Sequence, residues 1–349
     1  MFFASDNAGP AHPKVMEALV RANDGHAMPY GVDPIMDDVR AMIRDQFEAP
    51  EAAVYLVATG TAANAIALGT LAQPWETVFC SPEAHIHEDE CNAPEFFTGG
   101  AKLTLVPSID AKMTPDALRK SIAYEGGRGV HGPQRGPVSI TQVTERGTVY
   151  SLDELGALTA VAREFGLATH LDGARFANAL VALGCTPAEM TWKAGIDAVS
   201  FGGTKNGLLG VEAVIFFDPK HAWEFELRRK RGAHLFSKHR YLSAQMQAYL
   251  TDGLWLETAR LANANAAHLA KGLTDSNDAQ MVYPPQANMI FAEWPREGHQ
   301  RLHDAGAVYY VWAGELKGDD PAEPLQARLV CDWSIGADGV DRFLEALRG

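Results

Sequence analysis

The chain has 349 residues, 47% hydrophobic and 21% charged, so it is long and apolar enough to bury the core of a globular protein. Its 44 acidic and 30 basic residues give a formal charge of −14, which disfavours binding to nucleic acid or to anionic membranes. The four cysteines are far apart, and no apolar run approaches a membrane span of about 20 residues, which predicts a reduced, cytoplasmic protein.

Two helices are predicted near the start of the chain, after an irregular arm over residues 1–12. The segment "PKVMEALVRAN" begins with a proline suited to the first helical position. The segment "DPIMDDVRAMIRDQF" repeats this pattern, with Asp33 as the N-cap and Pro34 after it. The loop "GHAMPYG" lies between these two helices.

From Ala52 onward, short apolar runs alternate with helical patterns. In chain order they are "AVYLVA" with "TAANAIALGTLA", "KLTLVP" with "TPDALRKSIAY", "PVSITQV" with "SLDELGALTAVAREF", and "LATHL" with "ARFANALVALG". The strands "DAVSFGG" and "GVEAVIFFD" follow with a short loop between them. Strands that alternate with helices form a mostly parallel sheet covered on both faces, so we predict a large α/β domain over residues 13–248.

The pattern changes in the last third of the chain. A largely helical stretch from Lys220 to Leu273 leads to the strands "MVYPPQANMIFAEW", "AVYYVW" and "ARLVCDW" and to a final helix, "GVDRFLEALRG". This arrangement predicts a second, smaller α+β domain over residues 249–349.

Ligands of an open parallel sheet bind beyond the carboxyl ends of its strands, so polar residues there are the candidate site. The first strand ends in "VATGTAAN", whose backbone N–H groups at Gly60 and Thr61 could hold a phosphate, although such a turn alone is more often a plain helix cap. The stretch "HLDGAR" supplies Asp172 and Arg175, and "SFGGTKNG" supplies Lys205. Taken alone, Lys205 is more often a solvated loop residue and Asp172 is more often a helix cap. Together, a lysine amine, a carboxylate and a phosphate-binding helix start are what pyridoxal 5'-phosphate (PLP) requires.

The ordered motifs of the whole chain resemble one family. They are "SDNAGPAHP", "YGVDP", "ATGTAAN", "HIHEDE", "HLDGAR", "FGGTKNG", "RRKRGA" and "ARLV". In this order they resemble the threonine aldolases, including low-specificity L-threonine and phenylserine aldolases, which are fold type I PLP enzymes similar to aspartate aminotransferase. The resemblance implies cleavage of L-threonine, L-allo-threonine or related L-β-hydroxy-α-amino acids to glycine and an aldehyde. It also implies a homo-oligomer with shared active sites, at least a dimer and by expectation a tetramer.

The resemblance assigns the cofactor contacts to particular residues. Lys205 would bind PLP covalently, Asp172 would pair with the pyridine nitrogen, and His85 would stack on the ring. The Gly60–Thr61 turn would bind the phosphate, with Arg229 reaching in from a neighbouring subunit.

The substrate contacts follow from the same resemblance. Ser5, Arg175 and Arg328 would grip the substrate carboxylate, a task suited to the fork of a guanidinium group. Arg175 would also lie beside the cofactor network. Tyr30 would line the pocket, although a tyrosine beside a glycine is equally a loop anchor.

The base that acts on the substrate hydroxyl stays open. Many family members have a Thr-His pair after the strand that precedes "SLDEL", whereas this sequence has "QVTERGTVY", with Glu145 at the position of the histidine. His85, Glu145, the loop residue His131 and a bound water are all candidates. We favour a Glu145 that turns away toward Arg146, which predicts cleavage of both L-threonine and L-allo-threonine.

Two other interpretations compete with aldol cleavage. The same scaffold could support β-elimination or racemisation, or the chain could be a non-catalytic ligand-binding relative, against which the intact Lys205 and Asp172 argue. The adjacent residues His87–Glu90 resemble a metal cluster, but their crowding fits a helix start with acids in its first turn, so no metal is predicted.

Overall fold

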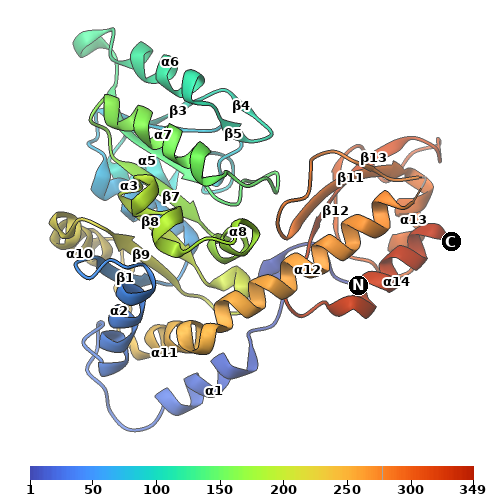
Figure 1. Cartoon of the computed structure of the whole chain (residues 1–349), viewed down its shortest axis with the longest axis horizontal. Helices are drawn as coiled ribbons and strands as arrows, with labels where there is room; N and C mark the ends of the chain where they lie inside the picture. Colours follow the sequence, from blue (N-terminus) through green and yellow to red (C-terminus); the bar gives the residue numbers. More distant parts are fainter. Residues whose placement is uncertain (277) are drawn as a thin grey trace.

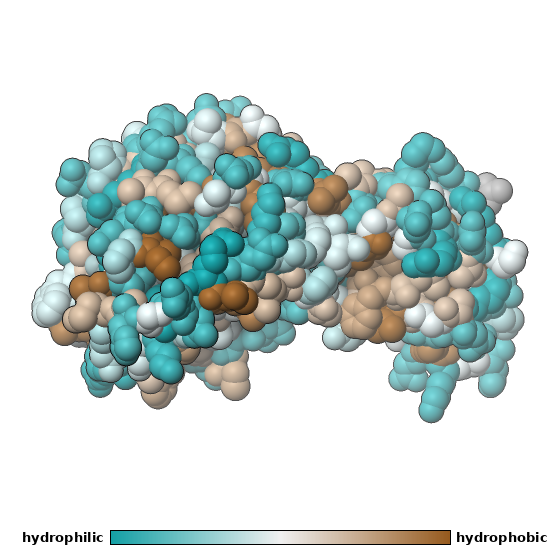
Figure 2. Space-filling model, turned by 90° about the horizontal axis from the view of Figure 1, so that it is seen from below, coloured by the Kyte–Doolittle hydropathy of each residue, from teal (hydrophilic) through white to brown (hydrophobic). Residues whose placement is uncertain are grey.

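The computed structural model describes residues 1–276 and 278–349. A larger and a smaller lobe are linked by the long helix α12 (Leu254–Thr274), which runs between them (Figure 1). Viewed from below, the two lobes meet at a narrower waist (Figure 2). Within the described part of the chain, no helix has both the length and the apolar character needed to cross a membrane.

A seven-stranded sheet forms the centre of the larger lobe, in the order β1-β9-β8-β7-β6-β2-β3. Its strands are β1 (Ala53–Val57), β2 (Glu76–Cys80), β3 (Lys102–Leu105), β6 (Gln134–Thr141), β7 (Thr169–Gly173), β8 (Ala198–Gly202) and β9 (Glu212–Phe216). The neighbouring pairs are parallel except for the two that β9 makes with β1 and β8. The predicted α/β class with a mostly parallel sheet is therefore confirmed, while the predicted pattern omitted β2.

Helices cover this sheet on both faces, as the alternation of runs predicts. The helices of this lobe are α1 (Pro13–Ala22), α2 (Pro34–Gln46), α3 (Gly60–Leu71), α4 (His85–Glu88), α5 (Ala93–Thr98), α6 (Pro115–Glu125), α7 (Leu152–Glu164), α8 (Phe176–Leu183), α9 (Pro187–Met190), α10 (Ala222–Arg231) and α11 (Arg240–Leu250). Local caps set several starts: Asp33 Oδ1 accepts a hydrogen bond from Met36 N at 3.0 Å, and Ser151 and Glu154 form a capping box.

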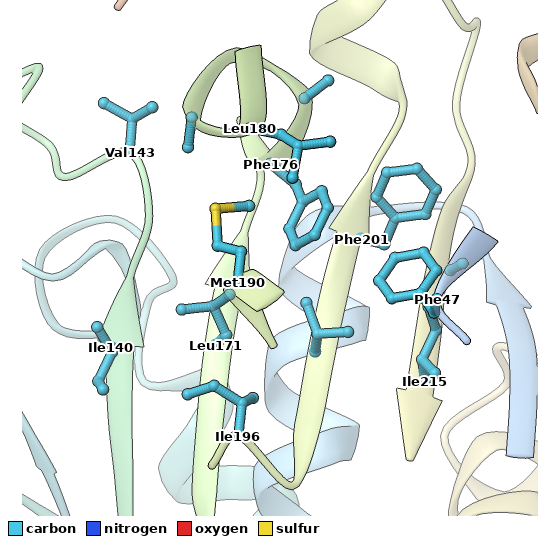
Figure 3. Packing of buried hydrophobic residues seen from close by; sticks show 14 of the residues in the cluster. Phe47, Ile140, Val143, Leu171, Phe176, Leu180, Met190, Ile196, Phe201 and Ile215 are labelled. Carbon is cyan, nitrogen blue, oxygen red and sulfur yellow. The ribbon is translucent and has the colours of Figure 1, made fainter. Parts of the chain in front are cut away.

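The core of the larger lobe lies against the central strands (Figure 3). Phe47 follows α2, Phe176 opens α8 and Phe201 lies on β8, and their ring centroids are 5.3 to 5.6 Å apart. Strands β1, β7, β8 and β9 are buried along their whole length, because helices pack on both sides of the sheet. The carboxyl ends of β1, β7 and β8 are therefore held in fixed relative positions.

The smaller lobe is an antiparallel sheet in the order β10-β11-β13-β12, covered by helices. Its elements are β10 (Gln280–Met281), β11 (Met289–Pro295), α13 (Arg296–Asp304), β12 (Tyr310–Ala313), β13 (Pro324–Val330) and α14 (Gly336–Arg348). Of these, α13 was not predicted. A separate hydrophobic core contains Phe3, Trp294 and Phe343, so the first residues of the chain also belong to this lobe. Phe3 N donates to Val308 O and Val330 N donates to Phe3 O, each at 2.8 Å.

Helix α12 contributes to both cores. Leu254 and Trp255, at its start, belong to the core of the larger lobe, whereas Leu269 and Leu273, near its end, belong to that of the smaller lobe. The domain boundary at residues 248/249 stays a prediction. The chain passes from the core of the larger lobe to the core of the smaller lobe within α12. A single helix anchored in both lobes fixes how the lobes meet.

Candidate active site

A cavity of about 360 Å³ opens at the carboxyl ends of β1, β7 and β8. Five predicted site residues line it: Gly60, Thr61, His85, Asp172 and Lys205. They come from four separate parts of the sequence and meet because parallel strands end at the same edge of the sheet.

The turn before α3 supplies unpaired backbone donors. Thr59 caps the helix, since its Oγ1 accepts a hydrogen bond from Ala62 N at 3.2 Å. The N–H groups of Gly60 and Thr61 have no acceptor among the described residues. The helix that follows carries no charged side chain and is buried from Ala62 to Thr70, so its N-terminus is a favourable place for a phosphate.

Lys205 lies on a tight turn, in the 3-10 helix of Thr204–Asn206. The preceding Gly202 must be a glycine, because a Cβ there would lie 2.4 Å from the carbonyl oxygen of Ala174. Lys205 Nζ makes no ion pair or hydrogen bond with any side chain that the structure describes, and the lysine lines the cavity. The close approach of the Gly202 backbone to Ala174 thus allows the turn that places the free amine of Lys205 at the end of β8.

Glu212 is a site residue that the sequence analysis missed. It begins β9, opposite Val57 of β1 and Gly202 of β8, and its Oε2 accepts a hydrogen bond from Gly203 N at 2.7 Å. Burial raises the pKa of Glu212 to about 7, against the opposing effects of Thr204, Gly203 and Lys205. Nothing in the sequence indicated that this carboxyl is buried in the site, because Glu212 stands at the start of its strand, whereas the other candidates were sought where strands end.

Asp172 is held at the end of β7 and is 2% exposed. Its Oδ1 accepts from Ala174 N at 3.1 Å and its Oδ2 from Asn64 Nδ2 at 2.9 Å. Helix α8 begins after Arg175 without a side-chain cap, so the carboxylate of Asp172 does not serve as the helix cap that was weighed as an alternative. Asn64, on α3, is a further site residue that sequence reasoning missed.

His85 opens the one-turn helix α4 and lies 2.9 Å, through Nδ1, from Oε1 of Glu90. This hydrogen bond raises the pKa of His85, with further support from Asp172 and Glu145 and opposition from burial and Lys205. Glu90 is buried, which corrects the interpretation of this one acid of "HIHEDE", whereas Glu88 is exposed in the first turn of α4 as expected. In the described residues no group of three or more His, Cys, Asp or Glu side chains is arranged to hold a metal.

Arg175 forms a bidentate ion pair with Asp6, and both side chains are buried. Its Nε and Nη2 donate to the Asp6 carboxylate at 2.7 and 2.9 Å. This edge of the guanidinium is occupied by Asp6, so the expected contact of Arg175 with a substrate carboxylate would use Nη1 and stays a prediction. Ser5 lies next to this pair as the cap of the turn Asp6–Ala8, and its Oγ accepts a hydrogen bond from Asn7 N.

Arg328, on β13, brings a second guanidinium from the smaller lobe. It makes no ion pair with the described residues, and its one hydrogen bond is a 3.6 Å contact from Nη2 to Met289 Sδ. Burial and the nearby Arg175 lower the pKa of Arg328, while Glu145, Asp6 and Asp89 oppose this. Arg328 therefore lies in the same charged neighbourhood as Arg175.

Glu145 is half-buried and has no hydrogen-bond partner among the described residues. Its negative charge acts to raise the pKa of His85, Arg175 and Arg328, so Glu145 lies near these three site residues. The expected partner Arg146 instead lies over the ring of Trp312, 5.1 Å from the centroid, and over Phe291. The prediction that Arg146 draws Glu145 away from the site is wrong.

Three predicted residues lie away from the cavity. His131 precedes β6 at its amino end, so the eight-residue strand puts it roughly 25 Å from the active edge in its own chain, which corrects its place as a pocket residue. Tyr30 is 43% exposed under Lys230. Arg229 is bound within its own chain, donating to Leu56 O and pairing with Glu226, so one chain gives no support for its reach toward a partner's phosphate.

Comparison with known proteins places this site in a family. The family model described as "Beta-eliminating lyase" matches residues 3–294. Low specificity L-threonine aldolase of Pseudomonas sp. (strain NCIMB 10558) is 41% identical over 95% of this chain and 92% of its own length. Low specificity L-threonine aldolase of Pseudomonas aeruginosa is 39% identical over 99% of this chain and 96% of its own.

A solved structure of threonine aldolase from Leishmania major has the same fold, with a TM-score of 0.92 and 27% identity over 99% of this chain and 98% of that one. The similarity therefore extends over both lobes, and the expected fold type and PLP dependence are confirmed. By the family model and by these relatives, the chain belongs to the beta-eliminating lyase family, among its threonine aldolases.

Proposed function

We propose that this protein is a PLP-dependent aldolase that cleaves L-threonine, L-allo-threonine and related L-β-hydroxy-α-amino acids, phenylserine among them, to glycine and an aldehyde. The observation that carries the proposal is the cavity in which a free lysine amine, a buried aspartate and the unpaired donors of a helix start meet. These groups fit PLP, because its aldehyde needs an amine, its ring nitrogen a carboxylate and its phosphate N–H donors.

The bound cofactor would supply one part of the chemistry. When bound, PLP supplies an electron-accepting ring that stabilises the negative charge left at Cα as the Cα–Cβ bond breaks. Lys205 would hold it covalently through Nζ, and the N–H groups of Gly60 and Thr61 would bind its phosphate. Asp172, fixed by Asn64 and Ala174, would keep the ring nitrogen protonated.

The substrate would meet the other wall of the site. Arg328 is a half-buried guanidinium without a carboxylate partner, and it would bind the carboxylate of the amino acid, assisted by the free Nη1 of Arg175 and by Ser5. His85 would face the ring and accept the proton of the substrate hydroxyl at Nε2, since its Nδ1 is held by Glu90.

One other reaction has a specific observation in its favour, because the matching family model is that of beta-eliminating lyases. The products decide among the possibilities when the holoenzyme is incubated with L-threonine. Aldol cleavage gives glycine and acetaldehyde in equal amounts, β-elimination gives 2-oxobutyrate and ammonia, and racemisation gives an epimer. Release of no product, with the amino acid bound, would leave a ligand-binding role.

We further propose a homo-oligomer, at least a dimer and by expectation a tetramer, in the cytoplasm. Val20, Val32, Phe96 and Trp223 are each 65% or more exposed and could pack against another copy of the chain. Apolar residues also interrupt the polar surface of the larger lobe in Figure 2. All four cysteines are free, in keeping with a reducing compartment. Sedimentation over a range of concentrations tests the assembly, and a fully active monomer would refute shared sites that use Tyr30 or Arg229.

A further inference from the structure

The roles proposed above leave Glu90, a carboxylate in the wall of the cavity, without a task. The side chain of Glu90 is fully buried, and its Oε1 lies 2.9 Å from His85 Nδ1 and 2.9 Å from Asn64 Nδ2. The same Asn64 nitrogen donates to Asp172 Oδ2. His85, Glu90, Asn64 and Asp172 thus form one continuous hydrogen-bonded row along the wall of the cavity.

The backbone makes a sharp turn that brings Glu90 inward. Helix α4 ends at Glu88, and Cys91 and Asn92 then both have positive φ angles, of 49° and 58°. Residues other than glycine seldom adopt this conformation, and each such residue costs stability. Ala93 N closes the turn by donating to Glu90 O at 2.9 Å. The turn directs the Glu90 carboxylate toward His85, a geometry that an acidic residue exposed to solvent would not require.

The contact determines which nitrogen of His85 faces the cavity. An ionised carboxylate only accepts hydrogen bonds, so Nδ1 must carry a hydrogen in both the neutral and the cationic ring. Nε2 is then the nitrogen left free, as an acceptor when the ring is neutral and as a donor when it is charged. A carboxylate that orients a histidine in this way is the arrangement that serine hydrolases use to fix the tautomer of their general base.

The negative charges around the ring act in the same direction as this contact. The hydrogen bond to Glu90 is the largest influence raising the pKa of His85, Asp172 and Glu145 add to it, and burial and Lys205 oppose it. Burial, with the charge of Asp172, raises the pKa of Glu90 itself, while His85 and Asn64 lower it. Asn64 lies between the two carboxylates and donates to both, which allows them to stay close in a buried site.

We propose that Glu90 is a positioning residue, which holds His85 with Nδ1–H toward its own carboxylate and Nε2 toward the cavity, and which sets how readily Nε2 takes up a proton. The proton transferred is that of the substrate hydroxyl, a detail that rests on the proposed function. The tautomer and the proton affinity of His85 do not depend on that function and can be measured without substrate.

The test is a titration of the His85 ring by NMR in the holoenzyme with ¹³C- and ¹⁵N-labelled histidine, repeated after cofactor removal. The signal is assigned by its loss in His85→Asn. Glu90→Gln keeps the shape and an accepting oxygen but removes the charge, so the pKa of His85 should fall. Because the base must be neutral to work, the acidic limb of kcat/KM should move to lower pH in the same variant. In Glu90→Ala, which also loses the acceptor, part of the ring should carry its hydrogen on Nε2.

Glu88→Gln is the matched control, since it removes one negative charge from an exposed position of the same short helix. It should leave the titration of His85 and the pH profile where they are in the wild type. A His85 titration that is the same in wild type and Glu90→Gln, or an acidic limb that stays in place while the titration moves, would overturn the proposal. Failure of the proposed function is a separate result, seen as absence of acetaldehyde from L-threonine in the wild type.

Discussion

The two walls of the cavity differ in how most of their charged groups are satisfied; the exceptions among the described residues are the free Lys205 on the cofactor side and the Arg175–Asp6 pair on the substrate side. On the cofactor side, Asp172, Asn64, Glu90 and His85 are hydrogen-bonded to one another before any ligand binds. On the substrate side, Arg328 and Glu145 have no ion-pair partner in the part of the chain that the structure describes.

The difference matches the time that each ligand spends in the site. A cofactor that stays bound through every turnover benefits from groups that are held in place in advance, because no reorganisation is then needed during the reaction. A substrate that comes and goes needs a charge that its own carboxylate can satisfy, and a half-buried, unpaired guanidinium is such a charge. Substitutions on the cofactor side should therefore mainly lower kcat, whereas substitutions on the substrate side should mainly change KM.

The largest loss is expected for Lys205→Ala, on the cofactor side. Without Nζ the cofactor has no amine to bind, so the adduct that borohydride traps on the wild-type protein should disappear together with nearly all turnover. Mass spectrometry after borohydride treatment checks the adduct. A covalent adduct that persists in the variant would show that another lysine holds the cofactor.

The second largest loss is expected for Asp172→Asn. This variant should still bind the cofactor, but the ring nitrogen should no longer be held protonated. The neutral amide can still accept from Ala174 N, yet it no longer favours a protonated ring nitrogen, so kcat should fall by orders of magnitude. Each 1.4 kcal/mol of lost transition-state stabilisation is about tenfold in rate. Cofactor absorbance and steady-state kinetics measure both properties, and an unchanged kcat would contradict the role.

Arg328→Gln tests the substrate wall. A lost charge-assisted hydrogen bond is worth about 1.5–3 kcal/mol, so kcat/KM for L-threonine should fall roughly tenfold to a hundredfold, mainly through KM. The amino alcohol that corresponds to threonine, which has no carboxylate, serves as the control ligand. If its binding weakens as much as that of threonine, Arg328 does not bind the carboxylate.

Glu145→Gln should have a smaller effect with an opposite sign on KM. Removing a negative charge near Arg175 and Arg328 makes this wall more positive, so the KM for the amino acid should fall a few-fold while kcat stays within about tenfold. Both L-threonine and L-allo-threonine should remain substrates. Strict preference of the wild type for one isomer, lost with activity in the variant, would instead identify Glu145 as the base.

The last expected effect is on stability rather than on turnover and comes from Glu212. Its pKa lies at about 7 in the folded protein, above the ordinary value of 4.5, so the folded state binds the extra proton. The stability that this proton contributes, on the order of a few kcal/mol, is fully present below about pH 4.5 and is lost as the pH rises through about 7. Denaturation of the cofactor-free protein between pH 5 and 8 should show this decline in the wild type and not in Glu212→Gln. Parallel curves for the two proteins would contradict the raised pKa.

Local chemistry was enough to predict much of the fold. Asp33 and Pro34 start α2 as predicted, because a cap and a proline act within one turn of their own position. Ser151 and Glu154 do the same for α7. The short strand β2 was missed because "ETVFC" has only five residues and is not followed by a long helical pattern.

The site was predictable where its residues stand at strand ends and not where they depend on distant partners. Lys205 and Asp172 could be found because the carboxyl ends of parallel strands share one edge. The pairing of Arg175 with Asp6 could not be predicted, since the two residues lie 169 positions apart and nothing local indicates it. Arg146 is adjacent to Glu145, yet it packs on Trp312 of the other lobe, so neighbourhood in sequence was misleading.

What the sequence determined by itself is therefore most of the elements, their alternation and the residues at the strand ends, because caps, periodicity and strand exits act over a few residues. The tertiary structure alone decided the direction of β9, the division of α12 between two cores and the partners of the buried charges. Glu90 shows the reason most clearly. Its sequence neighbours predict an exposed acid at a helix start, but burial against His85 and Asn64 makes it part of the site, and burial is a property of the packed chain as a whole.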